Sequence, residues 1–156
     1  ELREKNMAIV RKYIEYAGRE RVNRKEIYAE DVRGGLYTWD SGEIKPPFEG
    51  IEKRSLFDEK NTRSFPDWSH SDIIIYQTID PEVYVATCKG FGNYNNPRFG
   101  MPFYENFFFN TFVIKNGKIK EYYEHMNAVD MTKQYGMKSP ILKRPKREYK
   151  HLFDKE

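Results

Sequence analysis

The stretch that decides the fold is Phe103–Met126, which reads FYENFFFNTFVIKNGKIKEYYEHM. Near its centre, Asn116-Gly117 separates two runs rich in aromatic and β-branched residues. An Asn-Gly pair between two such runs is the strongest short-range signal for a β-hairpin, because both residues tolerate the positive φ that the turn requires. The sequence therefore predicts two antiparallel strands, over residues 102–114 and 118–126.

The first of these strands is apolar on both faces, although an antiparallel sheet with one face in water alternates apolar and polar residues. Successive side chains of a strand point to opposite faces. Odd positions carry Phe103, Phe107, Phe109 and Val113, and even positions carry Tyr104, Phe108, Phe112 and Ile114. One face can pack on helices, whereas the other needs a second cover. We therefore expect a homodimer formed sheet against sheet.

The rest of the chain supplies helices and further strands. Met7, Val10 and Ile14 fall on one face of a helix, and later runs alternate as strands do. The predicted elements are a helix closed by Gly18, a helix over 21–28, a strand over 34–40 with a turn at 40–42, a helix over 50–63, strands over 71–79 and 83–89, and a loop over 90–100. Helices followed by a run of antiparallel strands indicate an α+β domain with the helices on one face of the sheet.

Charge is distributed unevenly along the 156 residues, whose net charge is +3. Residues 138–156 hold 7 basic and 3 acidic side chains, so this tail carries +4 and residues 1–137 carry −1. A nucleic-acid-binding domain would carry its basic patch on the folded body. We expect a single domain over 1–137, a solvated basic tail over 138–156, and no nucleic-acid partner.

Cellular location is predicted from three features. No stretch approaches the roughly 18 consecutive apolar residues that a membrane helix needs, so we expect no membrane partner. The first residues, Glu1–Lys5, are charged where a secretory signal would be apolar. The one cysteine, Cys88, suits a reducing compartment. A cytoplasmic protein is the expectation.

Metal and nucleophilic chemistry have little support in the sequence. His70, His125 and His151 are scattered and show no zinc-ligand spacing, so we predict no metal and no other cofactor. Cys88 lies within a predicted strand and is interpreted as a small apolar filler. Gly90-Phe91-Gly92 follows a strand but no helix opens after it, so it is interpreted as a turn rather than a phosphate-binding loop.

Glu124 is the best candidate for chemistry. Burial among the apolar residues around it would disfavour its ionised form, so the carboxyl could hold a proton near neutral pH and act as a general acid. Its neighbour His125 should point to the opposite face, so the two should not form a catalytic pair. By parity Glu124 shares a face with Lys118 and Lys120 while Ile119 lies on the other, which leaves room for a β-bulge between them. The alternative is an exposed strand carboxylate or one paired with a lysine.

With these segments placed, the chain resembles the phenazine biosynthesis A/B family, within the ketosteroid-isomerase-like or SnoaL-like (nuclear transport factor 2-like) superfamily. The resemblance covers nearly the whole chain and consists of many short matches in order, with little change of spacing. The matches are Arg24 before Tyr28-Ala29-Glu30-Asp31, Gly34-Gly35-Leu36-Tyr37-Thr38, Asp40-Ser41-Gly42, Phe65-Pro66-Asp67-Trp68, Asp80-Pro81, Tyr104-Glu105-Asn106, Asn116-Gly117-Lys118-Ile119-Lys120, Glu124 and Met126-Asn127.

The resemblance implies a cone-shaped α+β barrel, with a strongly curved antiparallel sheet wrapped around the N-terminal helices, and a homodimer. It also implies a small cyclic carboxylic acid as substrate. Family members bring two molecules of an amino-oxo-cyclohexene carboxylic acid together, and each amine condenses with the other's ketone to form a tricyclic phenazine precursor. By the match, Glu124 is the catalytic acid, Arg24 binds the substrate carboxylate, and Tyr104 hydrogen-bonds the ligand.

Two departures from the family pattern concern the third predicted helix. Phe57 stands where active members carry a histidine, and Asn61 stands one turn further on where they carry a serine. Both positions belong to the implied substrate pocket, yet Phe57 cannot transfer a proton. His70 occupies a position that the family fills with an aromatic residue, so it is not taken as a substitute.

Two main hypotheses for function follow. The first is a condensing or proton-transfer enzyme that uses Glu124 as its acid. The second is a non-catalytic ligand-binding or partner subunit of the same fold, as Phe57 suggests. A ketosteroid-like isomerase or hydrolase is a third reading, based on superfamily analogy alone.

Overall fold

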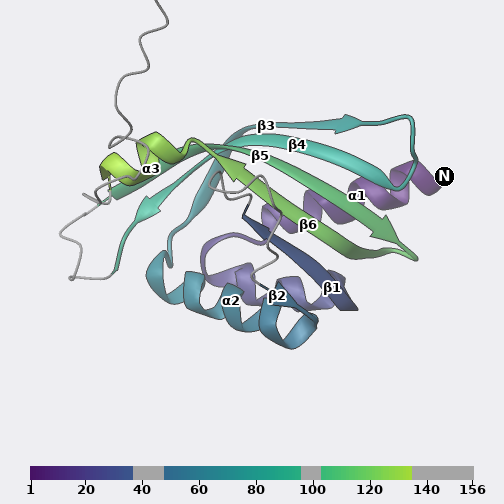
Figure 1. Cartoon of the computed structure of the whole chain (residues 1–156), viewed down its shortest axis with the longest axis horizontal. Coiled ribbons are helices and arrows are strands. Elements are labelled where there is room, and N and C mark those ends of the chain that lie inside the picture. The colour runs from purple at the N-terminus through teal and green to yellow at the C-terminus, as the bar shows by residue number, and fades with distance from the viewer. Residues whose placement is uncertain (37–47, 96–102, 135–156) are drawn as a thin grey trace, which may run out of the picture.

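The computed structural model describes residues 1–36, 48–95 and 103–134, and in them one curved sheet lies over two N-terminal helices and a third helix (Figure 1). The helices are α1 (Leu2–Glu15), the 3-10 helix η1 (Gly18–Ile27), α2 (Ile51–Ser64) and α3 (Ala128–Gln134). The strands are β1 (Tyr28–Leu36), β2 (Phe48–Glu49), β3 (Ser69–Gln77), β4 (Val83–Asn93), β5 (Phe103–Lys115) and β6 (Lys118–Met126). The predicted α+β class is confirmed, as are the opening helix and the helix after Gly50.

The sheet has six strands among the described residues, in the order β2-β1-β6-β5-β4-β3. Strands β3 to β6 pair antiparallel as predicted, whereas β1 pairs parallel with β6. Strand β1 begins six residues before the predicted start at Gly34, directly after η1. Gly34 lies within this strand, and the position requires glycine because a Cβ there would stand 1.6 Å from the backbone oxygen of Tyr122 on β6. The glycines therefore allow the two strands to approach each other closely and do not mark where the strand begins.

A β-bulge in β6 decides which way Glu124 points. Val113 pairs with Glu121 but Ile114 pairs with Ile119, so Lys120 is an extra residue in the ladder. A bulge shifts the alternation of side chains by one residue. Ile119 and Tyr122 are consequently both buried, although they stand an odd number of positions apart, three along the strand. The bulge that the parity argument left open is confirmed.

The two faces of β5 differ sharply in burial. Even positions from Tyr104 to Ile114 are buried and odd positions are exposed or half-buried. Helix α1 packs against β3, β4 and β5, and it contributes to the main core with Val10, Tyr13 and Ile14. The opposite face of the sheet leaves Phe103, Phe107 and Phe109 between 43% and 52% exposed in the single chain. The predicted two-sided strand is therefore confirmed, with one side open.

Helix η1 presents one face to the interior with a period of three residues. Gly18, Arg24 and Ile27 are buried and Arg21 is partly buried, while the residues between them are exposed. A 3-10 helix has three residues per turn, so side chains three apart eclipse one another. The predicted helix over 21–28 is thus wound more tightly than an α-helix. Arg21 and Arg24 therefore both lie on the inward face of this helix.

Strand β4 runs to Asn93, so the loop predicted to start at residue 90 is wrong for its first four residues. A Cβ at Gly90 would stand 2.4 Å from Cζ2 of Trp68 and 2.7 Å from Cε2 of Phe108. Gly90 is needed because two rings pack against the strand backbone there. Glycine in a strand can mark a close approach as well as a turn.

Four predicted features lie wholly or partly outside the described residues: the end of the strand over 34–40, the turn at 40–42, the end of the loop over 90–100, and the basic tail over 138–156. In the described part of the chain, no helix is both long enough and apolar enough to cross a membrane.

Candidate functional site

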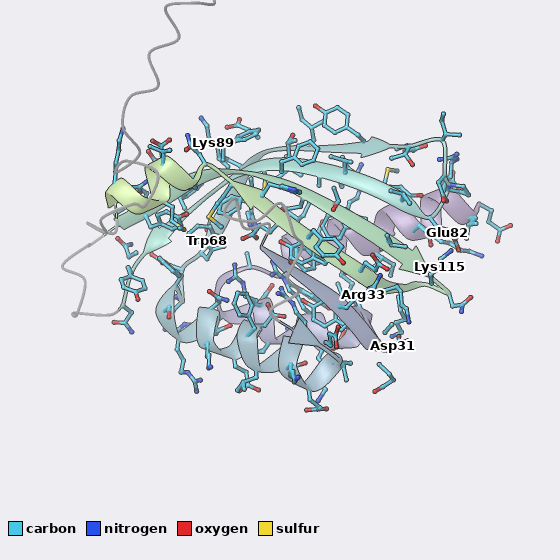
Figure 2. All side chains as sticks on the ribbon, viewed as in Figure 1. Asp31, Arg33, Trp68, Glu82, Lys89 and Lys115 are labelled. Carbon is cyan, nitrogen blue, oxygen red and sulfur yellow. The ribbon has the colours of Figure 1, made fainter. Side chains whose placement is uncertain are left out.

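The inner side of the sheet, η1 and α2 enclose a cavity of about 170 Å³, measured over the described residues. The residues that line it come from most of the chain, between Tyr13 on α1 and Met131 on α3. Trp68, one of the lining residues, lies beneath the end of the sheet that carries α3, and the Glu82–Lys115 ion pair lies at the opposite end of the sheet (Figure 2). All five site residues named from the sequence line this one cavity: Arg24, Phe57, Asn61, Tyr104 and Glu124.

Glu124 is the carboxyl group among the described residues that line the cavity. The phenolic oxygen of Tyr122 donates a hydrogen bond of 2.7 Å to its Oε2. Burial raises the pKa of Tyr122 well above its usual value, so the phenol keeps its proton and acts as the donor. His125 points away from the cavity, and its Nδ1 lies 3.0 Å from the carbonyl oxygen of Phe109. Glu124 and His125 therefore do not pair, as predicted.

One end of the cavity is aromatic. The rings of Trp68 and Tyr104 stack with centroids 5.8 Å apart, and Phe65 and Phe108 close the cluster. The Tyr104 hydroxyl accepts a hydrogen bond from Nδ2 of Asn106 at 3.0 Å. A flat apolar wall of this kind suits the face of a ring-shaped ligand.

Arg24 lines the cavity from within a buried polar network. Its Nε donates to the carbonyl oxygen of Tyr13 at 3.0 Å, and its guanidinium carbon lies 3.8 Å from the centroid of the Tyr13 ring. Its Nη1 stands 3.6 Å from Oδ1 of Asp58. Asp58 also accepts from Arg54 and from the hydroxyl of Tyr28, at 3.0 and 2.7 Å. Arg24 already faces a carboxylate of the protein itself.

Arg21 was not identified from the sequence, although it lines the cavity beside Arg24. Its buried Nε has no hydrogen-bond partner among the described residues. Burial lowers the pKa of Arg21 to about 10, and the neighbouring charge of Arg24 adds to the effect. The Arg-x-x-Arg spacing was the available signal, but it points to a shared face only once the helix is known to be 3-10.

His70 is fixed as a neutral ring. Its Nδ1 lies 3.1 Å from the carbonyl oxygen of Ile14, and its Nε2 accepts from Nε1 of Trp68 at 3.1 Å. Burial lowers its pKa to about 3, and the charges of Arg24 and Arg21 contribute. With both nitrogens engaged and the proton affinity this low, His70 does not replace the histidine that Phe57 displaces.

The two departures from the family pattern lie side by side on α2. Phe57 is 37% exposed, and the guanidinium of Arg54 lies 5.1 Å from its ring centroid. Nδ2 of Asn61 donates to the carbonyl oxygen of Phe57 at 3.0 Å.

Within the described ranges no group of three or more His, Cys, Asp or Glu side chains gathers as a metal site. Cys88 is fully buried and burial raises its pKa to about 12, so the predicted apolar filler role is confirmed.

Several further cavity residues were missed, and their signals differ. The Arg54-x-x-x-Asp58 spacing is typical of an ion pair along a helix, but it does not distinguish a surface pair from a buried one. Tyr122 could have been assigned to the cavity with Glu124, because both share a parity after the bulge. For Trp68 the sequence offers only a place in the motif Phe65-Pro66-Asp67-Trp68, which does not assign it to the cavity.

The architecture defines the class of this protein. A curved sheet around N-terminal helices with an internal cavity is the ketosteroid-isomerase-like, SnoaL-like fold. A candidate SnoaL-like polyketide cyclase from Jannaschia sp. CCS1 has the same fold, with a TM-score of 0.67 at 15% identity, over 87% of this chain and 94% of that one.

Within that class the chain belongs to the phenazine biosynthesis protein A/B family, whose model matches residues 1–147. Phenazine biosynthesis protein PhzB1 of Pseudomonas aeruginosa is 36% identical over 144 residues, 92% of this chain and 88% of the relative. PhzA2 of the same organism is 34% identical with the same coverage. The crystal structure of a phenazine biosynthesis-related protein, PhzB2 of P. aeruginosa, superimposes with a TM-score of 0.81 at 33% identity, over 95% of this chain and 89% of that one.

Proposed function

We propose that this chain binds a cyclic amino-ketone carboxylic acid in the Glu124 cavity and promotes its condensation with a second such molecule toward a tricyclic phenazine-type precursor. The observation that carries the proposal is the carboxyl of Glu124 inside an aromatic cavity, held by Tyr122. Membership of the phenazine biosynthesis A/B family supports the substrate class.

Each condensation is a balanced exchange that needs a proton donor and no oxidant. The amine nitrogen of one molecule forms a bond to the ketone carbon of the other, and a carbinolamine results. Glu124 then protonates the hydroxyl, the carbon–oxygen bond breaks, and water leaves as the imine forms. The proton released by the nitrogen restores the carboxyl. General acid catalysis of this kind contributes roughly 10²–10⁴-fold.

Cavity size bears on how the two molecules meet. The volume of about 170 Å³ is close to the roughly 150 Å³ of a protein cavity that accommodates benzene. It therefore suits one ring, and the second molecule reacts at the opening, where Phe57 is partly exposed. Orientation of two reactants can supply roughly 7–11 kcal/mol of the barrier.

The alternative is a ligand-binding or partner subunit without chemistry. It is favoured by Phe57, which cannot transfer a proton, and by His70, whose neutral ring offers no second acid. Under this alternative the cavity binds one cyclic acid and Glu124 serves only as a hydrogen-bonding group.

The substitution Glu124→Gln separates the two candidates. Under the enzyme proposal it abolishes condensation, followed by mass spectrometry of the products, and leaves ligand affinity by calorimetry largely intact. Glu121→Gln is the matched control, since Glu121 lies on the same strand but pairs with Arg33 outside the cavity. Unchanged condensation by the Glu124→Gln variant would contradict the assignment, and binding without any turnover in the wild type would favour the alternative.

The proposal also includes a homodimer and a cytoplasmic location. The exposed aromatic face of β5, with Phe103, Phe107 and Phe109, supports a second copy packed sheet against sheet. The free, buried thiol of Cys88 is compatible with a reducing compartment.

A further inference from the structure

Arg21 is the cavity guanidinium whose donors are least used. Its Nε is shielded from solvent and lacks a hydrogen-bond partner among the described residues. A buried donor without a partner costs free energy, more so when it is charged. Such a group in a folded protein calls for an explanation, and a ligand can supply it here because Arg21 lines the cavity.

The other two arginines of the cavity are engaged by the protein. Arg24 donates to a backbone carbonyl and faces Asp58, and its side chain is 3% exposed. Arg54 donates to Asp58, Tyr28 and Tyr13 at 2.8 to 3.0 Å. An anion at Arg24 would share that guanidinium with Asp58, and an anion at Arg54 would compete with the buried hydrogen bonds to Asp58, Tyr28 and Tyr13.

The charge balance around the cavity points the same way. Among the described residues, three guanidinium groups, those of Arg21, Arg24 and Arg54, stand near two carboxyl groups, those of Asp58 and Glu124. One positive charge is in excess even when both carboxyls are ionised. Burial and Arg24 together lower the pKa of Arg21, so an anion beside Arg21 would relieve the repulsion. The carboxylate of one bound ligand would balance this excess charge.

The position of Arg21 suits a ring that carries the anion. Its guanidinium carbon lies 5.9 Å from the ring centroid of Trp68, which belongs to the aromatic wall. A flat cyclic acid can therefore place its ring against that wall and direct its carboxylate at Arg21. Glu124 lines the same cavity, on the β6 side.

We propose that Arg21, rather than Arg24, receives the carboxylate of the ligand, and that Arg24 acts as a structural residue beneath it. The inference rests on the proposed function in one respect, namely that the ligand is a cyclic carboxylic acid. It adds the residue that selects an acid over a neutral ring of the same shape. A guanidinium can bind a carboxylate through two parallel hydrogen bonds.

The test compares two probes of equal shape, 3-oxocyclohexane-1-carboxylate and its carboxamide, by titration calorimetry. The wild type is expected to bind the acid at least about tenfold more tightly than the amide, the scale of a hydrogen bond to a charged group. Arg21→Gln should remove that preference by weakening the acid alone. Arg19→Gln is the matched control, because Arg19 is an exposed arginine on the same helix and lies outside the cavity. Arg21→Lys, which keeps the charge, should retain part of the preference.

Folding is monitored with each variant. Since Nε of Arg21 has no partner to lose, Arg21→Gln should melt at or above the wild-type temperature, whereas Arg24→Gln should melt well below it. If the Arg21→Gln variant kept the tenfold preference, the inference would be overturned and the proposed function would stand. If the wild type bound acid and amide equally, anion recognition would be overturned and ring binding would stand. Binding of neither probe would refute the proposed function, and the inference with it.

Discussion

Tyr122 and Glu124 stand two residues apart on β6, and the phenol of the first donates a 2.7 Å hydrogen bond to the carboxyl of the second. Tyr122 is 2% exposed, and its oxygen also lies 3.4 Å from Oδ1 of Asn110 on the neighbouring strand. The phenol thus fixes the direction of the carboxyl from the interior side. Tyr122 is a positioning residue for the proposed acid.

Removal of this phenol should affect turnover more than binding. Tyr122→Phe is expected to lower kcat by about 10- to 100-fold, the scale of one hydrogen bond that strengthens as the carboxyl gives up its proton. Ligand affinity and the melting temperature should change little, because the ring stays in place. A variant with a weakened affinity and an unchanged kcat would show that the phenol binds ligand and does not position Glu124.

The buried network under the cavity should dominate the stability of the fold. Asp58 is 1% exposed and accepts from Arg54 and Tyr28, so Asp58→Asn leaves guanidinium groups without their counter-charge. We expect a loss of about 3–5 kcal/mol in the free energy of unfolding, measured by urea denaturation. Glu52 lies on the same helix as Asp58 but forms an exposed ion pair with Lys25 of η1, so Glu52→Gln should leave the unfolding midpoint essentially where it was.

Gly90 should be intolerant of even one added carbon. Gly90→Ala brings a Cβ within 2.4 Å of the Trp68 ring, and overpacking of this kind costs about 1–3 kcal/mol. Thermal and urea unfolding would measure it. In a Trp68→Leu background the same substitution should cost less, because one of the two colliding rings is gone. An equal cost in both backgrounds would assign the effect to the strand backbone instead.

The sequence predicted features set by local patterns and missed those set by contacts across the chain. The hairpin at Asn116-Gly117 followed from turn chemistry, and the two-sided strand followed from parity. Gly90 was misread as part of a loop because its need for glycine comes from the ring of Trp68, 22 residues upstream. Strand β1 was predicted too late because glycines commonly mark turns, whereas Gly34 permits a close approach to β6.

The candidate site shows the same division. Glu124 could be found from its apolar neighbours, and the family resemblance supplied Arg24. Nothing local distinguishes Arg24 from Arg21, because both lie on the inward face of one short helix. Which guanidinium is engaged depends on Asp58, 34 residues further on, and therefore on how α2 packs against η1.

Acid should destabilise the fold through His70. Its pKa is lowered from 6.5 to about 3 in the folded chain, so between those values the unfolded chain binds a proton that the folded chain does not. The contribution of the neutral ring is complete above pH 6.5 and is lost as the pH falls toward 3. Between pH 7 and pH 5 the loss should reach at most about 2 kcal/mol in the free energy of unfolding. His70→Gln should remove this slope, whereas His125→Gln, on the outer face, should keep it.

The open face of the sheet should hold a second copy of the chain. Register aligns Ile74, Thr87, Phe109 and His125 in one row across four strands, and Ile74 and Phe109 are 51% and 43% exposed. A glutamate at position 109 would place a charge in the middle of that contact, where an uncompensated buried charge is costly. Light scattering at micromolar concentration should therefore give a dimer mass for the wild type and a monomer mass for Phe109→Glu. Ile79→Glu, at a 98% exposed residue beyond the end of β3, should remain dimeric. A monomeric wild type at that concentration would contradict the predicted dimer and would require another explanation for three exposed phenylalanines on one strand.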